Sequence, residues 1–118
     1  MESEKTVYSY FSDAMLLEHL KKSDRLAFIE IFERYWKKVY NESYKRIKNH
    51  TLAESITECV FINLWEEREN AKTDKLLPYL LASLRFCILQ LYIEGKADGH
   101  FENGLSYRML SSTPTGIN

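Results

Sequence analysis

The sequence predicts an all-α fold, a helical bundle of three long helices and a short leading helix. Apolar residues recur at helical spacing through most of the 118 residues. We find no run in which apolar and polar residues alternate as they do in a strand. The Asn103-Gly104 pair, a common hairpin turn, lies in a glycine-rich C-terminal stretch. A chain of this length can form one hydrophobic core but not two.

Serines mark the expected starts of the first two helices. Residues 1–11 show no helical periodicity, and we expect them to fray. Ser12 is expected to cap a short helix that reaches Lys22, and Ser23 a long helix that reaches Ile47, with Asp24 in its first turn. The short helix is expected to turn one side inward, with Met15, Leu16, His19 and Leu20. The long helix is expected to bury an aromatic-rich stripe: Leu26, Phe28, Ile29, Ile31, Phe32, Tyr35, Trp36, Val39, Tyr40 and Tyr44.

Residues 51–67 predict the next helix. Thr51 and Glu54 have the spacing of a capping box, in which each side chain bonds the other residue's backbone amide. One face is apolar, with Leu52, Ala53, Ile56, Val60, Phe61, Leu64 and Trp65. The other is acidic, because residues 51–70 hold five glutamates and a single basic residue, Arg68. Such a charged face is either simply solvated or a binding surface.

The last helix is expected at residues 74–92, with Thr73 as its N-cap and Pro78 near its first turn. Gly95 should end it. Residues 96–118 have the glycine, serine and threonine content of a linker. We therefore expect one domain at 12–95 and a flexible tail at 96–118.

Charge and cysteine usage indicate a soluble cytoplasmic protein. The formal net charge is −1, although basic residues outnumber acidic ones nine to four between Lys21 and His50. Cys59 and Cys87 fall in apolar helical patterns without a secretory signal, which predicts buried free thiols in a reducing compartment. No apolar run appears long enough to span a membrane.

The sequence offers little for catalysis. His19, His50 and His100 lie in separate segments, so we expect no metal site. Neither a phosphate-binding glycine loop nor a nucleophile elbow is present, and we predict no cofactor and no enzymatic activity. The class of function that remains is recognition of another macromolecule.

Several spaced motifs support a family resemblance. They are Asp24-Arg25-Leu26-Ala27-Phe28, Phe32-Glu33-Arg34-Tyr35, Ala53-Glu54-Ser55-Ile56, Val60-Phe61-Ile62-Asn63-Leu64-Trp65 and Tyr79-Leu80 with Arg85. In this order they resemble region 2 of bacterial RNA polymerase sigma factors, specifically the extracytoplasmic-function group in the form common among Bacteroidetes.

The resemblance implies a transcription initiation factor domain that binds the clamp helices of the polymerase β′ subunit and helps to recognise and melt the −10 promoter element. The implied polymerase-binding residues are Glu54, Ser55, Glu58, Cys59 and Ile62. The implied DNA-binding residues are Arg68, Asn70, Lys72, Lys75, Ser83, Arg85, Phe86 and Gln90. An antisigma factor is a further implied partner. The family's second, −35-reading domain has no counterpart after Gly95, so either the chain is truncated or it is a stand-alone region 2.

Departures from the family pattern leave an alternative open. Where the family has Gln-Glu, this chain has Glu58-Cys59, and where it has Arg-Asn, this chain has Arg85-Phe86. A basic position of the family is Ile93 here. These changes favour a diverged, sigma-like protein-interaction module that does not read DNA.

Overall fold

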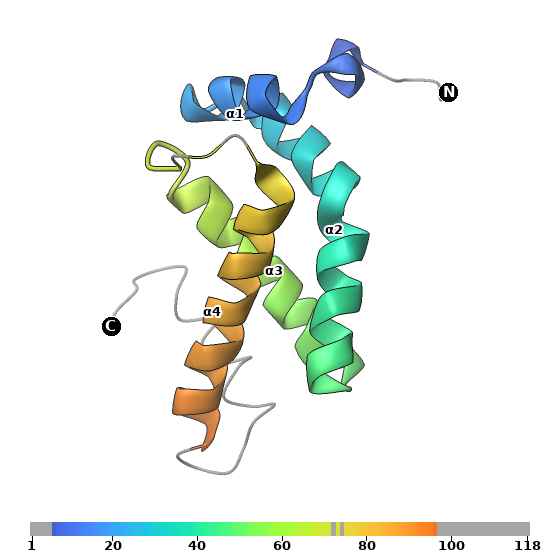
Figure 1. The fold of residues 1–118 in the computed structure, drawn as a ribbon, viewed down its shortest axis with the longest axis vertical. Helices are drawn as coiled ribbons and strands as arrows, with labels where there is room; N and C mark the ends of the chain where they lie inside the picture. Colours follow the sequence, from blue (N-terminus) through green and yellow to red (C-terminus); the bar gives the residue numbers. More distant parts are fainter. Residues whose placement is uncertain (1–5, 72, 74, 97–118) are drawn as a thin grey trace.

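The computed structural model describes residues 6–71, 73 and 75–96, and over these residues it is all-helical (Figure 1). The elements are a 3-10 turn η1 (Val7–Tyr10), then α1 (Asp13–Lys21), α2 (Arg25–Ile47), α3 (His50–Glu66) and α4 (Leu76–Lys96). The predicted fold class, three long helices and a short leading one, is confirmed.

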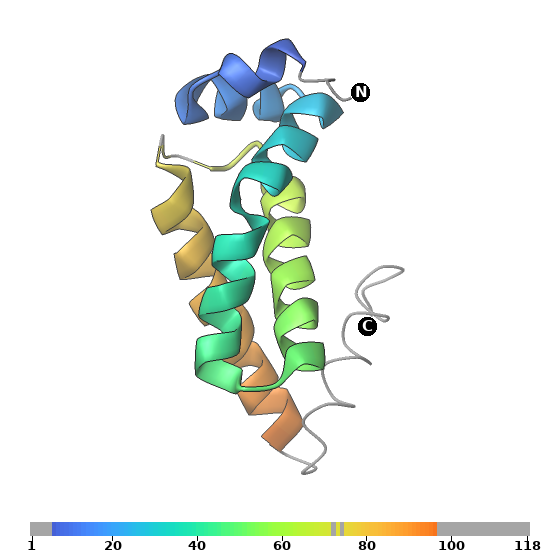
Figure 2. The same ribbon diagram turned by 90° about the vertical axis from the view of Figure 1, so that its right-hand side faces the viewer.

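The three long helices run alternately down and up. After the two-residue connection that follows α2, α3 returns antiparallel to it, and α4 runs back along both, while α1 crosses one end of this bundle (Figures 1 and 2). Side chains from all four helices form one core: Leu16, Leu17, Leu20, Ala27, Ile31, Val39, Leu52, Ile56, Val60, Phe61, Leu64, Leu76, Leu80, Leu84, Cys87 and Leu91. Residues 97–118, the predicted tail, lie outside the described residues.

The start of α1 is as predicted, but two other caps differ. The Ser12 hydroxyl accepts the Met15 amide at 3.1 Å. The cap of α2 is Asp24, not Ser23: its Oδ1 accepts the Leu26 amide at 3.0 Å, whereas Ser23 has a left-handed backbone with φ of 64°. A carboxylate one residue before the helix reaches its first amides better than a hydroxyl two residues before it.

The predicted capping box of α3 is wrong. Asn49 is the N-cap and its side chain accepts the Leu52 amide at 2.9 Å, so the helix begins at His50 and Thr51 lies inside it. Asparagine caps at least as well as threonine, and here the earlier capping residue prevails.

The bounds of α4 also shift. The Thr73 hydroxyl accepts the Lys75 amide at 3.0 Å, and the helix begins at Leu76 rather than at 74. It continues through Gly95 and ends at Lys96.

The largest difference concerns which face of α2 is buried. Ala27, Ile31, Val39 and Ser43 are buried, whereas Leu26, Ile29, Phe32 and Trp36 are exposed by 36–53%. The ten residues of the predicted stripe cover a wider arc than the neighbouring helices can bury, so part of the stripe faces solvent. In α1, similarly, Leu17 is buried and Met15 is exposed.

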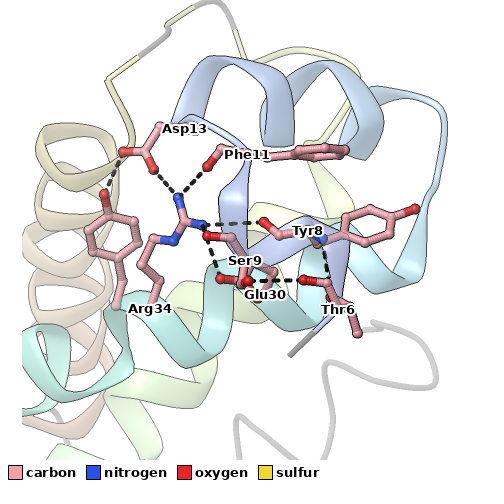
Figure 3. A network of polar contacts seen from close by, with 8 residues as sticks. Thr6, Tyr8, Ser9, Phe11, Asp13, Glu30 and Arg34 are labelled. Atoms are coloured by element: carbon pink, nitrogen blue, oxygen red, sulfur yellow. Dashed lines mark hydrogen bonds and ion pairs between the residues drawn. The ribbon is translucent and has the colours of Figure 1, made fainter. Parts of the chain in front are cut away.

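We expected residues 1–11 to fray, but residues 7–10 form the η1 turn; residues 1–5 lie outside the described residues. Arg34 of α2 binds η1 and the start of α1 (Figure 3). Its two terminal nitrogens donate at 3.0–3.4 Å to the carbonyl oxygens of Tyr8, Ser9 and Phe11 and to the carboxylates of Asp13 and Glu30. Residues 7–11 lack helical periodicity, and the hydrogen bonds from the Arg34 guanidinium hold them against α2 instead.

Helix α4 is more apolar than we expected from the sequence. Leu76–Glu94 has the length and composition of a membrane span, so the prediction that no run reaches that length is wrong. However, the inner face of this helix lies in the core, with Leu76, Leu80, Leu84 and Leu91 at 1% exposure or less. Only 28% of the stretch is buried, so much of this apolar helix lies outside the core. The compact fold is consistent with a soluble protein.

Candidate functional site

Most of the residues implied to bind polymerase share the outward face of α3. Glu54 and Glu58 are exposed, and Ser55 and Ile62 are partly exposed. Residues 54, 58 and 62 follow one another at i, i+4, so they form one row along the helix. Cys59 departs from this row, because it turns toward α4 and contacts Cys87.

An apolar row on α2 lies beside this acidic row. Ile29 is 50% exposed, and Phe32 and Trp36 are 36% exposed. The Phe32 ring packs edge-on against that of Phe61, with centroids 5.0 Å apart, and Phe61 follows Glu58 by three residues, on the same side of α3. We name Ile29, Phe32, Trp36, Glu54, Glu58 and Ile62 the α2–α3 surface.

Three members of the α2–α3 surface were missed by sequence reasoning. Ile29, Phe32 and Trp36 were assigned to the core because they fit a helical apolar stripe. The available signal was the width of that stripe, since an arc broader than one core-facing side implies that some members are outside.

A groove of about 340 Å³ continues this surface toward the start of α2, lined by Arg25, Phe28, Ile29 and Trp65. The rings of Phe28 and Trp65 meet edge to face with centroids 5.4 Å apart. The guanidinium of Arg68 lies 4.2 Å from the centre of the Trp65 ring, and that of Arg25 lies 5.8 Å from it. Two guanidinium groups therefore lie over the Trp65 ring at one end of the α2–α3 surface, whose middle is acidic.

The carboxylates of the α2–α3 surface belong to Glu54 and Glu58. None of the ion pairs found in the described part of the chain involves either of them. Two like charges at i, i+4 cost a few tenths of a kcal/mol, roughly 0.2–0.5, which a basic partner would remove.

Arg68, implied to bind DNA, is engaged within the fold. Its Nε donates to the Ser23 hydroxyl at 2.8 Å, and its Nη1 donates to the Trp65 carbonyl oxygen at 2.6 Å. It also stacks on the Trp65 ring. The structure thus uses Arg68 to join the end of α3 to the start of α2.

The connection between α3 and α4 holds three more implied DNA contacts. The Asn70 amide donates to the Glu67 carboxylate at 2.9 Å, across a turn. Lys75 is exposed immediately before α4. Lys72 lies outside the described residues.

The implied DNA contacts on α4 do not lie together. Ser83 and Gln90 are on either side of Cys87 along one flank, and Cys87 contacts α3. Arg85 is two residues from Cys87, about 200° around the helix. It lines a separate, shallow groove of about 270 Å³ with Arg46, Ile88, Leu89 and Tyr92. Ser83 and Gln90 therefore lie on one side of α4, and Arg85 lies on another, in the groove with Leu89 and Tyr92.

The outward face of α4 is largely apolar. Phe86 is 55% exposed, Leu89 54%, Tyr92 52% and Ile93 65%. Of the implied DNA-binding set, Phe86 lies on this face, and Arg85 lines a groove with Leu89 and Tyr92. Few monomeric proteins leave contiguous large apolar side chains this exposed without a partner.

Two of the three histidines have structural neighbours. The His19 ring lies 3.1 Å, through Nδ1, from the Asp24 carboxylate and packs against Tyr8 and Phe11. His50 Nδ1 lies 2.5 Å from the Tyr40 hydroxyl. His100 lies outside the described residues. Within the described part of the chain, no group of three or more histidine, cysteine, aspartate or glutamate side chains is placed to hold a metal ion.

The Asp24 carboxylate is the polar centre of this end of the fold. Tyr8 donates its hydroxyl to Asp24 at 2.6 Å. That hydrogen bond, with those from His19 and the α2 amides, holds the pKa of Asp24 below its ordinary value, and it raises the pKa of Tyr8. This cluster sits at the α1–α2 junction, away from the α2–α3 surface, and its partners account for a structural role.

Comparisons with family models, with curated proteins and with solved structures found no match.

Proposed function

We propose that this chain is a cytoplasmic transcription initiation factor domain that binds core RNA polymerase through the α2–α3 surface and contributes to −10 promoter recognition and melting. The sequence resemblance to sigma region 2 supports this function. The observation that carries it is the row of Glu54, Glu58 and Ile62 on α3, exposed or partly exposed beside the apolar row of α2.

The composition of this surface suits a basic helical partner such as the clamp helices of the β′ subunit. Large apolar side chains, here Phe32 and Trp36, supply most of the binding free energy once a partner covers them. Carboxylates at Glu54 and Glu58 would pair with basic residues, which speeds encounter and fixes orientation.

Charge reversal on α3 tests the proposal. Calorimetry of this chain with an isolated β′ clamp-helix fragment, at near-physiological salt, should show binding that Glu58→Lys weakens at least tenfold. Glu18→Lys on α1 makes the same charge change at an exposed position far from the surface, and it should bind as the parent does. Circular dichroism must show the same helical content in all three chains. A folded Glu58→Lys variant with undiminished affinity would refute the proposal.

A second candidate is a protein-interaction module that keeps the clamp-binding surface but does not read DNA. The observation that favours it is the outward face of α4, which presents Phe86, Leu89, Tyr92 and Ile93 where phosphate partners would be needed. Arg85 alone of the implied contacts on α4 is basic, and it lines a groove with Leu89 and Tyr92 of this apolar face. Few cations mean weak, salt-sensitive affinity for DNA.

Fluorescence anisotropy with single-stranded oligonucleotides separates the two candidates. A −10-like strand and a scrambled strand of the same composition are titrated at low and at physiological salt. Preference for the −10-like strand that Phe86→Ala removes supports the initiation factor, because an exposed ring can stack on an extruded base. Equal binding of both strands, or none, supports the interaction module.

A further inference from the structure

Cysteines from two helices meet in the core between α3 and α4. The Sγ atom of Cys87 donates to that of Cys59 at 2.9 Å, although the residues are 28 positions apart. The side-chain amide of Asn63 donates to both sulfurs, at 3.5 Å to Cys87 and 3.9 Å to Cys59. Both cysteines are reduced, and they are the only two in the sequence.

The two thiols differ in their access to solvent. Cys87 is 4% exposed, whereas Cys59 is partly exposed at the edge of α3. A small oxidant can therefore reach Cys59, and the sulfur of Cys87 lies next to that of Cys59. A more exposed thiol paired with a nearby resolving thiol is the usual arrangement of redox-sensitive cysteines.

We propose that Cys59 and Cys87 form a modification site at which a hydroperoxide converts the thiol pair into a disulfide that joins α3 to α4. The sulfurs need to approach by less than 1 Å to reach the S–S bond length of about 2.05 Å. This site is independent of the function proposed above.

The reaction balances with hydrogen peroxide as the oxidant. Cys59 loses its proton, and its sulfur attacks one peroxide oxygen, so that the O–O bond breaks and a sulfenic acid and one water form. The Cys87 sulfur then attacks the sulfenic sulfur. The S–O bond breaks, the Cys87 proton leaves with the hydroxyl group as a second water, and the disulfide is formed. Two electrons pass from the sulfurs to the peroxide.

Asn63 favours both steps from its place between the sulfurs. Its N–H groups stabilise the negative charge that develops on a sulfur as it attacks. Because Asn63 is one turn from Cys59 on α3, it moves with that sulfur and holds the pair together.

The loop closed by the disulfide would run from residue 59 to residue 87, which covers the end of α3, the connection and half of α4. Closing a loop of this length restricts the unfolded chain and should raise Tm by roughly 10 °C.

Intact mass spectrometry of the full chain gives the test. After exposure to a few equivalents of hydrogen peroxide, the protein should lose two hydrogens, about 2 Da, and both titratable thiols. Non-reducing peptide mapping should link Cys59 to Cys87. Dithiothreitol should restore the original mass and Tm.

Two comparisons keep the inference falsifiable. The folded chain should form the disulfide at least tenfold faster than the same chain in strong denaturant, where the sulfurs are apart. Asn63→Ala keeps both thiols and should slow the folded-state reaction severalfold, whereas Asn70→Ala, in the exposed turn, should not. Gain of oxygen atoms without loss of hydrogens, linkage between chains, or equal rates in folded and denatured protein would overturn the proposal.

Discussion

The guanidinium of Arg34 lies 3.1 Å from the carboxylate of Asp13, and this ion pair joins α1 to α2. The second oxygen of Asp13 accepts the hydroxyl of Tyr35. The pKa of Tyr35 is raised to about 12, mainly by burial of the phenol and secondly by its hydrogen bond to Asp13. Asp13 is also the first residue of α1, where a negative charge is favoured by the helix dipole.

Arg34→Ala should lower the free energy of unfolding by about 2–3 kcal/mol, because it leaves two carboxylates and three carbonyl oxygens without their shared donor. Arg34→Lys keeps the charge but not the planar fork, and it should recover only part of the loss. Urea denaturation measures both variants.

Arg46→Ala serves as the control for this prediction. It removes an exposed ion pair with Glu42 at 3.1 Å and should lower the free energy of unfolding far less than Arg34→Ala does, because solvent screens an exposed pair. Equal losses from Arg34→Ala and Arg46→Ala would show that the Arg34 contacts do not hold η1 and α1 in place.

Acid should weaken the fold through Asp24. Its pKa is lowered in the folded state, first by the Tyr8 hydrogen bond, so its contribution to stability is complete above the ordinary pKa of 3.8 and is lost as pH falls through the lower folded value. Asp24→Asn keeps a capping oxygen but removes the titrating charge. The difference in unfolding free energy between parent and variant should therefore be constant above about pH 5 and shrink below it.

The measurement is urea denaturation at pH 5 and at pH 2.5, repeated with His19→Gln in both chains so that the imidazole that faces Asp24 is absent from both. A difference that is the same at both pH values would exclude Asp24 as a source of acid sensitivity.

Ser43 carries a buried hydroxyl without a hydrogen-bond partner in the described part of the chain. Ser43→Ala removes this unsatisfied group and improves helix propensity, and it should raise the free energy of unfolding by about 1 kcal/mol. Thr57→Val is the matched comparison, since the Thr57 hydroxyl donates to the Ala53 carbonyl oxygen at 2.8 Å. That variant should lose about 1 kcal/mol. Destabilisation by Ser43→Ala would mean that its hydroxyl is satisfied in solution.

Helix number, order and fold class could be predicted from the sequence because 3.6-residue periodicity is a local property. The buried face of α2 could not be predicted, because both Ile29 and Ile31 fit a helical stripe and only packing against the other helices buries Ile31 rather than Ile29. The caps were misplaced for a related reason. Ser23, Asp24, Asn49 and Thr51 are all good capping residues, and the choice depends on where the chain turns between helices.

The candidate site was predictable where it follows one helix. Glu54, Glu58 and Ile62 share a row on α3 because of their spacing alone. Other parts of the site involve residues far apart in sequence. Phe32 and Trp36 of α2 lie beside that row, and Cys59 of α3 contacts Cys87 of α4. Only the packing of one helix on another brings such residues together.

Lys48 ends α2 in the left-handed conformation, with φ of 59° and its amide bonded to the Tyr44 carbonyl oxygen at 2.7 Å. A residue with a Cβ atom is strained there, whereas glycine is not. Lys48→Gly should therefore raise the free energy of unfolding by about 0.5–1 kcal/mol, measured by urea denaturation. Lys45→Gly, three residues earlier inside the helix and equally exposed to solvent, should instead lower it by about 1 kcal/mol. If both glycines destabilise the fold alike, the left-handed turn after α2 does not persist in solution.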